Sequence, residues 1–235
     1  MSTKKIFSAL GFSKISATLF ILLILSACKN DSEKSDKINI GFSQGLGSHP
    51  WRQSMNHAME IQASLHSEVQ LSISKAEGSV KKQIQDIQKM IDSRVDIIII
   101  SPIEPNSLIP LVEKAYEQKI PVILVDRKIN SSKYTTYIGA DNIEIGKEAA
   151  QYILSDSKNL KKIIEIKGDD NSSPTIERSL GFQQTIKNNS NTELIKTFKG
   201  LPAEAFRKTL DSLGNQSLYV FAFNDELASQ AWQVA

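Results

Sequence analysis

The chain has 235 residues, with 28 lysines and arginines against 26 aspartates and glutamates, and one cysteine. This length is enough for one or two small domains with a buried core. A single cysteine excludes an intramolecular disulfide and a cysteine-based metal site. The chain has no block of basic residues, so nothing in it indicates a nucleic-acid partner.

The N-terminal segment has the pattern of an export signal. Three lysines precede an apolar run over residues 15–25, which is shorter than the roughly 20 residues of a membrane-spanning helix. A basic start, an apolar middle and small residues are typical of a secretory signal peptide. The tetrapeptide LSAC, which ends at Cys28, matches the bacterial lipobox, in which the cysteine is lipidated and becomes the new N-terminus. The alternative is that Cys28 is an incidental free thiol.

These features predict a lipoprotein signal peptide over residues 1–27, lipidation at Cys28 and a polar tether over residues 28–37. The signal contains three lysines and no acidic residue. The mature chain would therefore carry 25 basic and 26 acidic residues, a net charge of −1.

From residue 38 onward, strand patterns and helix patterns alternate. Val80, Ile84, Ile87 and Ile91 recur at helical spacing, while the four isoleucines of residues 97–100 predict a strand buried on both faces. In chain order we predict a strand over 38–43, a helix over 50–65, a strand over 69–74, a helix over 79–93, a strand over 95–101, a helix over 106–119, strands over 121–125 and 137–139, a helix over 142–155, a strand over 161–167, a helix over 173–188, a strand over 192–199, a helix over 202–213, a strand over 218–224 and a helix from 226.

This alternation predicts an α/β fold with parallel sheets and right-handed crossovers. Two runs of it join near residues 137–142, which predicts two Rossmann-like, doubly wound lobes over 38–140 and 141–235. The final helical pattern is followed by no closing strand, so the second lobe is predicted to be incomplete, as in a truncated product or one module of a longer protein.

One motif suggests an enzyme. The sequence GFSQG, residues 41–45, satisfies the G-x-S-x-G pattern of the α/β-hydrolase nucleophile elbow. In that fold the base histidine follows the serine and the acid, but all three histidines lie within 23 residues of Ser43, and none follows His66. A hydrolase that uses Ser43 is therefore the less favoured hypothesis. The GLGSHP segment lacks the third glycine of a dinucleotide fingerprint, and the histidines lack metal-site spacing; we predict no cofactor and no metal.

Polar side chains that follow the predicted strands indicate a ligand site, because ligands of open parallel sheets bind beyond the carboxyl ends of the strands. Carboxylate and amide oxygens accept from hydroxyls, guanidinium groups donate to them, and an indole ring stacks on a sugar ring. The predicted sugar-binding residues are Trp51, Arg52, Asp126, Arg127, Arg178 and Asn224. A second set, predicted to bind the ligand or to form the hinge, comprises Gln44, His49, Ser101, Glu104, Asp141 and Asp225.

Each of these residues also has a plain structural interpretation. Trp51 could be a core anchor, and Asp126 with Arg127 could be an ordinary loop ion pair. Arg178 could lie on a solvated helix face. Glu104 and Asp141 could be helix caps.

Several segments together resemble the type I periplasmic sugar-binding proteins, the ribose-binding and lac-repressor-like family. These segments are IGFSQ, HPWRQSM, DIIIISPIEPNSLIPLVEKAYEQKIPVILVDR, YIGADN, SSPTIERSLGFQQTI and VFAFNDELASQAW, and the resemblance covers about residues 38–235. It implies two lobes that close on a monosaccharide, either a pentose or a hexose, without catalysis. The family's ligand-binding positions match Trp51, Asp126, Arg127, Arg178 and Asn224.

The chain also departs from that family. Arg52 and Ser101 stand where the family has an aromatic residue and an asparagine, and Ala205 stands at a further aromatic position unless Phe206 takes that role. These departures leave the sugar open. The family's C-terminal portion, which contributes the last site residues, has no counterpart here.

The segments GFSQ, WRQSM, YIGADN and SSPTIERSLGF are similar to those of the periplasmic sensor modules of Bacteroidetes hybrid two-component regulators. The lipobox instead indicates a freestanding receptor anchored to the membrane at Cys28. The resemblance therefore implies a periplasmic location and one of two partners, an ABC permease or a membrane histidine kinase. A third hypothesis is a non-functional remnant, for which cooperative unfolding is not expected.

Overall fold

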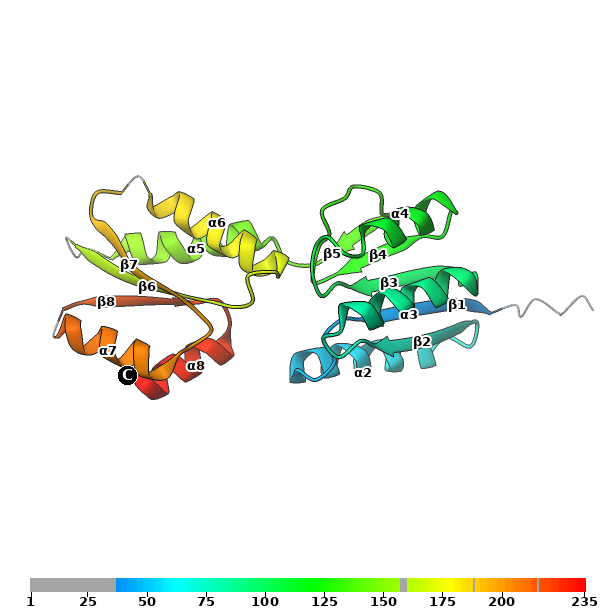
Figure 1. Ribbon diagram of the computed structural model, residues 1–235, viewed down its shortest axis with the longest axis horizontal. Coiled ribbons are helices and arrows are strands. Elements are labelled where there is room, and N and C mark those ends of the chain that lie inside the picture. Colours follow the sequence, from blue (N-terminus) through cyan, green and yellow to red (C-terminus); the bar gives the residue numbers. More distant parts are fainter. Residues whose placement is uncertain (1–36, 157–159, 188, 215) are drawn as a thin grey trace, which may run out of the picture. The chain divides into compact units, whose positions relative to one another are not determined.

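The computed structural model describes residues 37–156, 160–187, 189–214 and 216–235 (Figure 1). Residues Lys37–Ala235 form one compact unit. The predicted signal peptide, the lipidation site at Cys28 and all but the last residue of the tether lie outside the described residues, and they stay predictions.

The first sheet has five parallel strands in the order β2-β1-β3-β4-β5. This is a doubly wound order, in which the chain reverses its direction of travel across the sheet between β1 and β3. The five strands are β1 (Ile38–Gln44), β2 (Val69–Lys75), β3 (Ile97–Ser101), β4 (Val122–Val125) and β5 (Thr136–Ile138).

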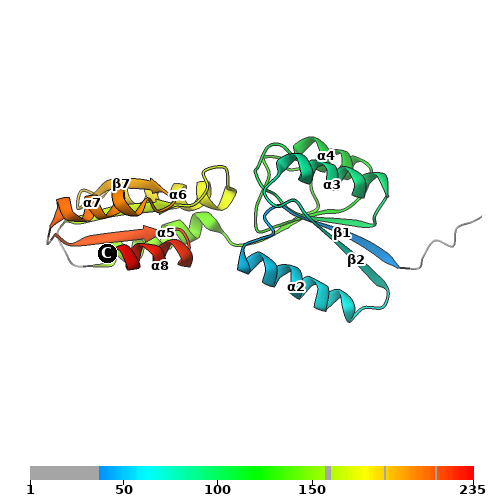
Figure 2. The same ribbon diagram turned by 60° about the horizontal axis from the view of Figure 1, so that its bottom comes forward.

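Three helices cover this first sheet. Helix α2 (Pro50–Ser64) lies on one face, whereas α3 (Val80–Asp92) and α4 (Ile109–Glu117) lie on the other (Figure 2). Pro50 at the first helical position begins α2, because its missing N–H would have no partner there. We use "first lobe" for the first sheet with these helices.

The isoleucine run of β3 is fully buried on one face only. Ile98 and Ile100 are 0% exposed and pack against α3 and α4, whereas Ile97 and Ile99 are half-buried. The prediction of burial on both faces is therefore wrong for one face. The physical reason is that α2 is the one helix in the described residues that covers this side.

The second sheet has three parallel strands in the order β7-β6-β8. Its elements are α5 (Asn142–Ser155), β6 (Lys161–Lys167), α6 (Ser173–Ile186), β7 (Thr192–Lys199), α7 (Ala203–Leu213), β8 (Leu218–Ala222) and α8 (Asp225–Val234). Helices α5 and α6 cover one face, and α7 and α8 cover the other (Figure 1). We use "second lobe" for this sheet and its four helices.

Four phenylalanines form much of the second core. Phe182 stacks on Phe221 with ring centroids 4.4 Å apart, and Phe206 contacts Phe198 edge to face at 5.9 Å. Phe206 is only 1% exposed. The suggestion that Phe206 supplies an aromatic side chain to the ligand is therefore wrong, because its ring fills the core.

Helices α5 and α6 approach each other closely at two glycines. A side chain at Gly146 would meet the carbonyl oxygen of Arg178, and one at Gly181 would meet that of Ile143. Only glycine allows backbones to come this close. The contact brings the first residue of α5, Asn142, to the middle of α6.

The predicted elements are all present, with ends that differ by a few residues. Helix α4 begins at Ile109 instead of residue 106, and β3 begins at Ile97 instead of residue 95. The predicted α/β class with parallel sheets is confirmed. The boundary between the two lobes at residue 140 stays a prediction, although β5 ends at Ile138 and α5 begins at Asn142. None of the helices in the described ranges is long and apolar enough to cross a membrane.

Candidate ligand-binding site

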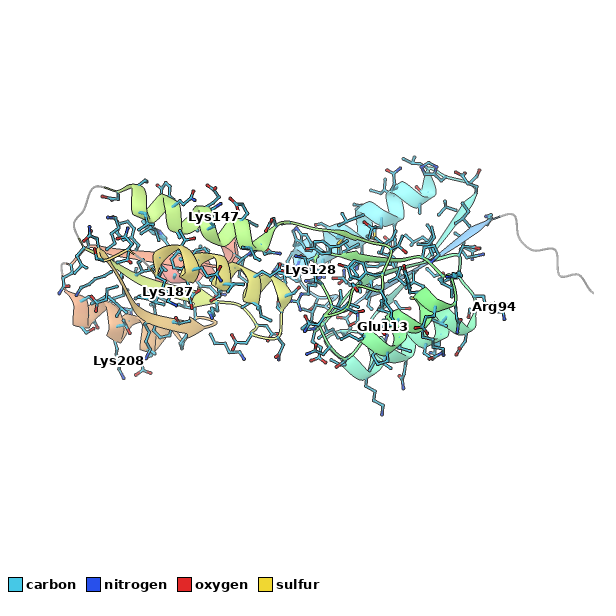
Figure 3. The ribbon with its side chains drawn as sticks, turned by 90° about the horizontal axis from the view of Figure 1, so that it is seen from above. Arg94, Glu113, Lys128, Lys147, Lys187 and Lys208 are labelled. Atoms are coloured by element: carbon cyan, nitrogen blue, oxygen red, sulfur yellow. The ribbon has the colours of Figure 1, made fainter. Side chains whose placement is uncertain are left out.

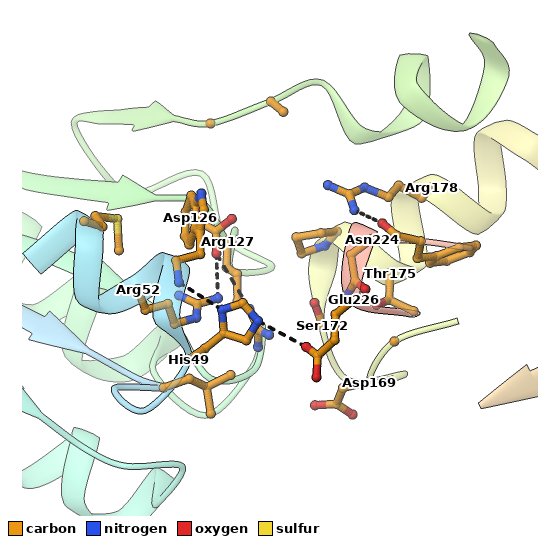
Figure 4. Close-up of a pocket in the computed structure, with 18 of the residues that line it drawn as sticks. His49, Arg52, Asp126, Arg127, Asp169, Ser172, Thr175, Arg178, Asn224 and Glu226 are labelled. Carbon is orange, nitrogen blue, oxygen red and sulfur yellow. Dashed lines mark hydrogen bonds and ion pairs between the residues drawn. The ribbon is translucent and has the colours of Figure 1, made fainter. Parts of the chain in front are cut away.

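A cavity of about 1000 Å³ lies at the carboxyl ends of the strands (Figure 4). Parallel strands present their carboxyl ends at one edge, so the polar residues after several strands meet there. Its lining includes eight of the predicted ligand or hinge residues: His49, Trp51, Arg52, Asp126, Arg127, Arg178, Asn224 and Asp225.

Asp126 follows directly on β4 and has φ of +66°. This is the left-handed region, which aspartate tolerates better than most residues. Its N–H donates to the carbonyl oxygen of Ile138 at 2.9 Å, which closes the end of the strand. The conformation turns the Asp126 side chain toward the cavity, where its carboxylate is 24% exposed.

The close ionic partner of Asp126 is Arg52, not its neighbour Arg127. Arg52 Nη2 donates to Asp126 Oδ2 at 2.7 Å, whereas Arg127 Nε lies 4.0 Å from the same oxygen. Asp126 and Arg127 thus form only a long ion pair, and with side chains 24% and 10% exposed it is not the exposed loop pair of the alternative interpretation. The pair between Arg52 and Asp126 joins α2 to the end of β4 across the cavity floor.

Two predicted ligand or hinge residues hold Arg52 from behind. Arg52 Nη1 donates to Ser101 Oγ at 2.8 Å and to Gln44 Oε1 at 3.2 Å. Gln44 and Ser101 are both 0% exposed and are not among the described residues that line the cavity. For these two the assignment to ligand or hinge is corrected, because they fix the guanidinium that faces the cavity.

Arg127 lines the cavity and also has one buried donor without a partner. Its Nη1 donates to the carbonyl oxygen of Ile103 at 2.6 Å, while its buried Nε has no hydrogen-bond partner in the described structure. Burial lowers the pKa of Arg127, and the nearby charge of Arg52 lowers it further. An unpaired buried donor is costly, so a rearrangement that gave Arg127 Nε an acceptor would be stabilising.

Trp51 lies at the mouth of the cavity. Its side chain is 52% exposed, and the guanidinium carbon of Arg52 lies 5.6 Å from its ring centroid. The core-anchor interpretation of Trp51 is therefore wrong. A half-exposed indole face offers a stacking surface for a sugar ring.

His49 connects the first lobe to the second across the mouth. Its Nδ1 accepts from the N–H of Trp51 at 3.2 Å, which caps α2, and its Nε2 lies 3.3 Å from Glu226 Oε2. Because Nδ1 acts as an acceptor, the ring proton is on Nε2 and points to the Glu226 carboxylate.

The second lobe contributes Arg178 from α6 and the start of α8. Arg178 Nε donates to Asn142 Oδ1 at 3.0 Å, and Nη1 donates to the carbonyl oxygen of Phe223. Burial lowers the pKa of Arg178. Arg178 is thus anchored and half-buried, so its interpretation as a residue of a solvated helix face is wrong.

Asn224 and Asp225 stand at the first turn of α8. The Asn224 side chain caps the helix by accepting from the N–H of Leu227 at 2.8 Å, and both residues line the cavity. Two further predicted residues are not brought there. Asp141 caps α5 by accepting from the N–H of Glu144 at 3.0 Å, and Glu104 is absent from the described lining.

The sequence-based prediction missed the segment that follows β6. Asp169, Ser172 and Thr175 line the cavity. The rule that ligands bind beyond strand ends would have found them, because GDDNSS comes directly after a predicted strand.

Gln83 was also missed. It lies on α3, is 0% exposed, and clamps the loop after β3: its Nε2 donates to the Ser101 carbonyl oxygen at 2.9 Å, and its Oε1 accepts from the Ile103 N–H at 3.0 Å. The carbonyl oxygen of the same residue, Ile103, accepts from Arg127 Nη1. The sequence signal that could have identified Gln83 is a polar residue on the side of α3 that faces the core.

Ser43 does not have the geometry of a nucleophile elbow. It lies within β1 and is 0% exposed, whereas the elbow places its serine exposed on a strand-to-helix turn. Within the described ranges, no group of three or more histidine, cysteine, aspartate or glutamate side chains could hold a metal ion. The cavity instead offers guanidinium donors, carboxylate acceptors and one indole face.

Comparison with known proteins identifies the family. A model of the periplasmic binding protein domain matches residues 40–235. The galactofuranose-binding protein YtfQ of Escherichia coli is 27% identical over 227 residues, which are 92% of this chain and 71% of that protein.

Two solved structures are also similar. The fructose-binding periplasmic domain of a hybrid two-component system is 38% identical, with a TM-score of 0.75 over 84% of this chain and 67% of that one. The binding protein of an arabinose ABC transporter from Shewanella sp. ANA-3, bound to L-arabinofuranose, is 29% identical, with a TM-score of 0.75 over 83% of this chain and 68% of that one. Because the chain covers about two thirds of each of these two-lobed structures, the second lobe of their architecture is partly present in it. Together with the match over residues 40–235, this shows that the chain belongs to the periplasmic binding protein domain family.

Proposed function

We propose that the chain is a receptor that binds one monosaccharide between its two lobes. The observation that carries this is the arrangement of the cavity: the Arg52–Asp126 pair lies on the first-lobe side, and Arg178 and Asn224 lie on the second (Figure 4). Trp51, on α2 of the first lobe, also lines the cavity. A sugar ring offers a C–H face for the indole and hydroxyls that both donate and accept. Members of the family are binding proteins, and the relatives include periplasmic proteins, which implies a periplasmic location.

The furanose form is the proposed ligand class. Two of the relatives above carry galactofuranose or arabinofuranose in their names, and the sensor domain carries fructose, a sugar that also forms a five-membered ring. In the cavity, Arg52 stands where the resemblance predicts a second aromatic ring. The site therefore has one stacking face and one charged fork, which suits a small ring with several exocyclic hydroxyls.

The individual roles follow from the contacts. The Asp126 carboxylate keeps lone pairs beyond the one used by Arg52 and would accept from a sugar hydroxyl. Arg127 would donate through its guanidinium, and Arg178 through the donors that Asn142 and Phe223 do not use. The chain would release its sugar unchanged, as expected for a family of binding proteins.

The two lobes would close on the sugar and present the closed form to a membrane partner. Relatives with both kinds of partner are known, an ABC transporter and a hybrid two-component system. Lipidation at Cys28 would keep the receptor at the membrane in either case. A permease partner predicts sugar uptake that depends on this chain, and a kinase partner predicts sugar-dependent phosphorylation.

Isothermal titration calorimetry against D-fructose, L-arabinose, D-galactose, D-ribose and D-glucose tests the proposal. We expect saturable binding of at least one sugar able to form a furanose ring and no turnover of it. Absence of heat with every sugar would contradict the proposed function. Binding of D-glucose alone would contradict the furanose class.

A further inference from the structure

An ion pair outside the cavity joins the two lobes. Lys128 Nζ donates to Glu177 Oε1 at 2.7 Å, and the two side chains are 33% and 18% exposed. Figure 3 labels Lys128 on the side of the first lobe that faces the second. A second bond lies beside it, because the Lys128 N–H donates to Ser173 Oγ at 2.8 Å. The Lys128 ammonium also lies 5.0 Å from the ring centroid of Tyr137, in cation–π range.

The partners of this ion pair are sequence neighbours of the proposed ligand residues. Lys128 follows Arg127, and Glu177 precedes Arg178. Both arginines line the cavity, whereas Lys128 and Glu177 are not part of its described lining. The same two backbone segments therefore carry the ligand contacts on one side and the interlobe ion pair on the other.

Glu177 also orients the anchor of Arg178. Its Oε2 lies 3.4 Å from Asn142 Nδ2, which also donates to the Ala140 carbonyl oxygen at 3.3 Å. With its amide nitrogen held by these two acceptors, Asn142 turns its Oδ1 toward Arg178 Nε, at 3.0 Å. Asn142 is 2% exposed, so water cannot readily replace a lost partner.

We propose that Glu177 is a positioning residue for sugar binding, and that its ion pair with Lys128 is a latch that holds the two lobes in register. The inference rests on the proposed function for its effect on affinity. Glu177 links three groups: the cation of the first lobe, the amide at the start of α5 and, through that amide, Arg178. Because both side chains are partly buried, removal of one partner leaves the other charge poorly solvated, which costs more than breaking an exposed surface pair.

The test compares Lys128→Met, Glu177→Gln and the double variant of the full chain. In calorimetry with D-fructose, or with whichever sugar of the panel binds, each single variant should weaken affinity roughly tenfold through loss of the partly buried pair. The double variant should lose no more than Glu177→Gln alone, because both substitutions break one interaction. If the affinity losses of the two single variants multiplied in the double variant, the two residues would act independently and the latch would be overturned.

A matched control is Lys82→Met. Lys82 pairs with Asp86 at the same 2.7 Å distance, but within α3. This variant should leave sugar affinity unchanged within about twofold, as expected for a site that shares no partner with the cavity. Affinities of Lys128→Met and Glu177→Gln that match this control would overturn the positioning role.

A ligand-free measurement separates this proposal from the proposed function. Spin labels on cysteines at the exposed positions Lys81 and Lys208, in a Cys28→Ser background, report the distance between the lobes. Lys128→Met should broaden the distance distribution, and Lys82→Met should not. An unchanged distribution would overturn the latch even if sugars bind, and a broadened one would support it even if no sugar in the panel binds.

Discussion

The carboxylate of Asp126 and the guanidinium of Arg52 are 2.7 Å apart, although 74 positions separate them in the chain. Arg52 is 7% exposed and donates also to Ser101 and Gln44. Asp126 reaches it from a left-handed backbone with φ of +66°. The pair therefore has two roles, as part of the cavity wall and as a tie between α2 and β4.

Substitution of Asp126 should separate these two roles. Both Asp126→Ala and Asp126→Asn should weaken sugar binding at least about tenfold, because a hydroxyl loses its charged acceptor. Asp126→Ala should also lower the free energy of unfolding by about 1–3 kcal/mol, because Arg52 loses its carboxylate partner and alanine must adopt the left-handed backbone of position 126. Asparagine tolerates that conformation and keeps one oxygen, so its stability loss should be smaller.

A stability loss is expected beside the affinity loss because the Asp126 carboxylate also binds Arg52. Urea unfolding and calorimetry measure the two effects. Asp211→Asn, at an exposed position of α7, is the control and should change neither. Sugar affinity retained in Asp126→Asn would remove Asp126 from the proposed site.

Trp51 should report binding by its fluorescence. The chain has two tryptophans, Trp51 in the cavity lining and Trp232 on α8, with exposed fractions of 52% and 85%. A sugar that stacks on the indole should change the emission of Trp51. We expect Trp51→Phe to abolish this change and Trp232→Phe to keep it; the reverse pattern would place the ligand elsewhere.

Stability gives a second readout for the same residue. Because its ring is half exposed, Trp51→Ala should lower the free energy of unfolding by less than about 1 kcal/mol, well below the 3–5 kcal/mol of a core aromatic. Affinity should still fall about tenfold or more, since stacking on an aromatic face contributes on the order of 1–2 kcal/mol.

Much of the fold follows from sequence periodicity. Alternating strand and helix patterns specify parallel sheets, and the helix that begins at Pro50 and the strand of residues 161–167 lie where the pattern placed them. The isoleucine run of β3 shows the limit. Residue type reports that a strand can be buried on both faces, but the helices that pack on each face decide whether it is.

The site was predictable in position and less so in role. Residues after strand ends do meet at one cavity, and eight of those predicted line it. Gln44 and Ser101 are the instructive exceptions. They are paired in the register of β1 and β3, still inside the sheet, so their side chains reach Arg52 and not the ligand space. No spacing in the sequence indicates that the Arg52 side chain lies over Gln44 and Ser101 and binds them.

Gln83 should prove important for stability although it touches no ligand. Gln83→Leu leaves the partly buried Ile103 N–H and the Ser101 carbonyl oxygen without their partner, which should lower the free energy of unfolding by about 2 kcal/mol. The carbonyl oxygen of Ile103 anchors Arg127, so sugar affinity should fall as well. Gln85→Leu, at an exposed position of the same helix, should leave both quantities unchanged. Chemical denaturation and calorimetry measure them, and a stability equal to that of the control would contradict the clamp.

Tyr137 should ionise late in an alkaline titration. Burial, followed by the charges of Glu177 and Asp126, raises its pKa from the usual 10.0 to about 12. Its hydroxyl donates to the Asp126 carbonyl oxygen at 3.1 Å and can do so only while protonated. Since the folded pKa is the higher one, the stability that Tyr137 contributes is complete below pH 10.0 and is lost as the pH rises toward about 12.

Tyrosinate absorbance should therefore show a late step that Tyr137→Phe reduces. Tyr219, whose pKa is also raised to about 12, accounts for the rest of that step. A late step of the same size in Tyr137→Phe would show that Tyr137 is not held against Asp126.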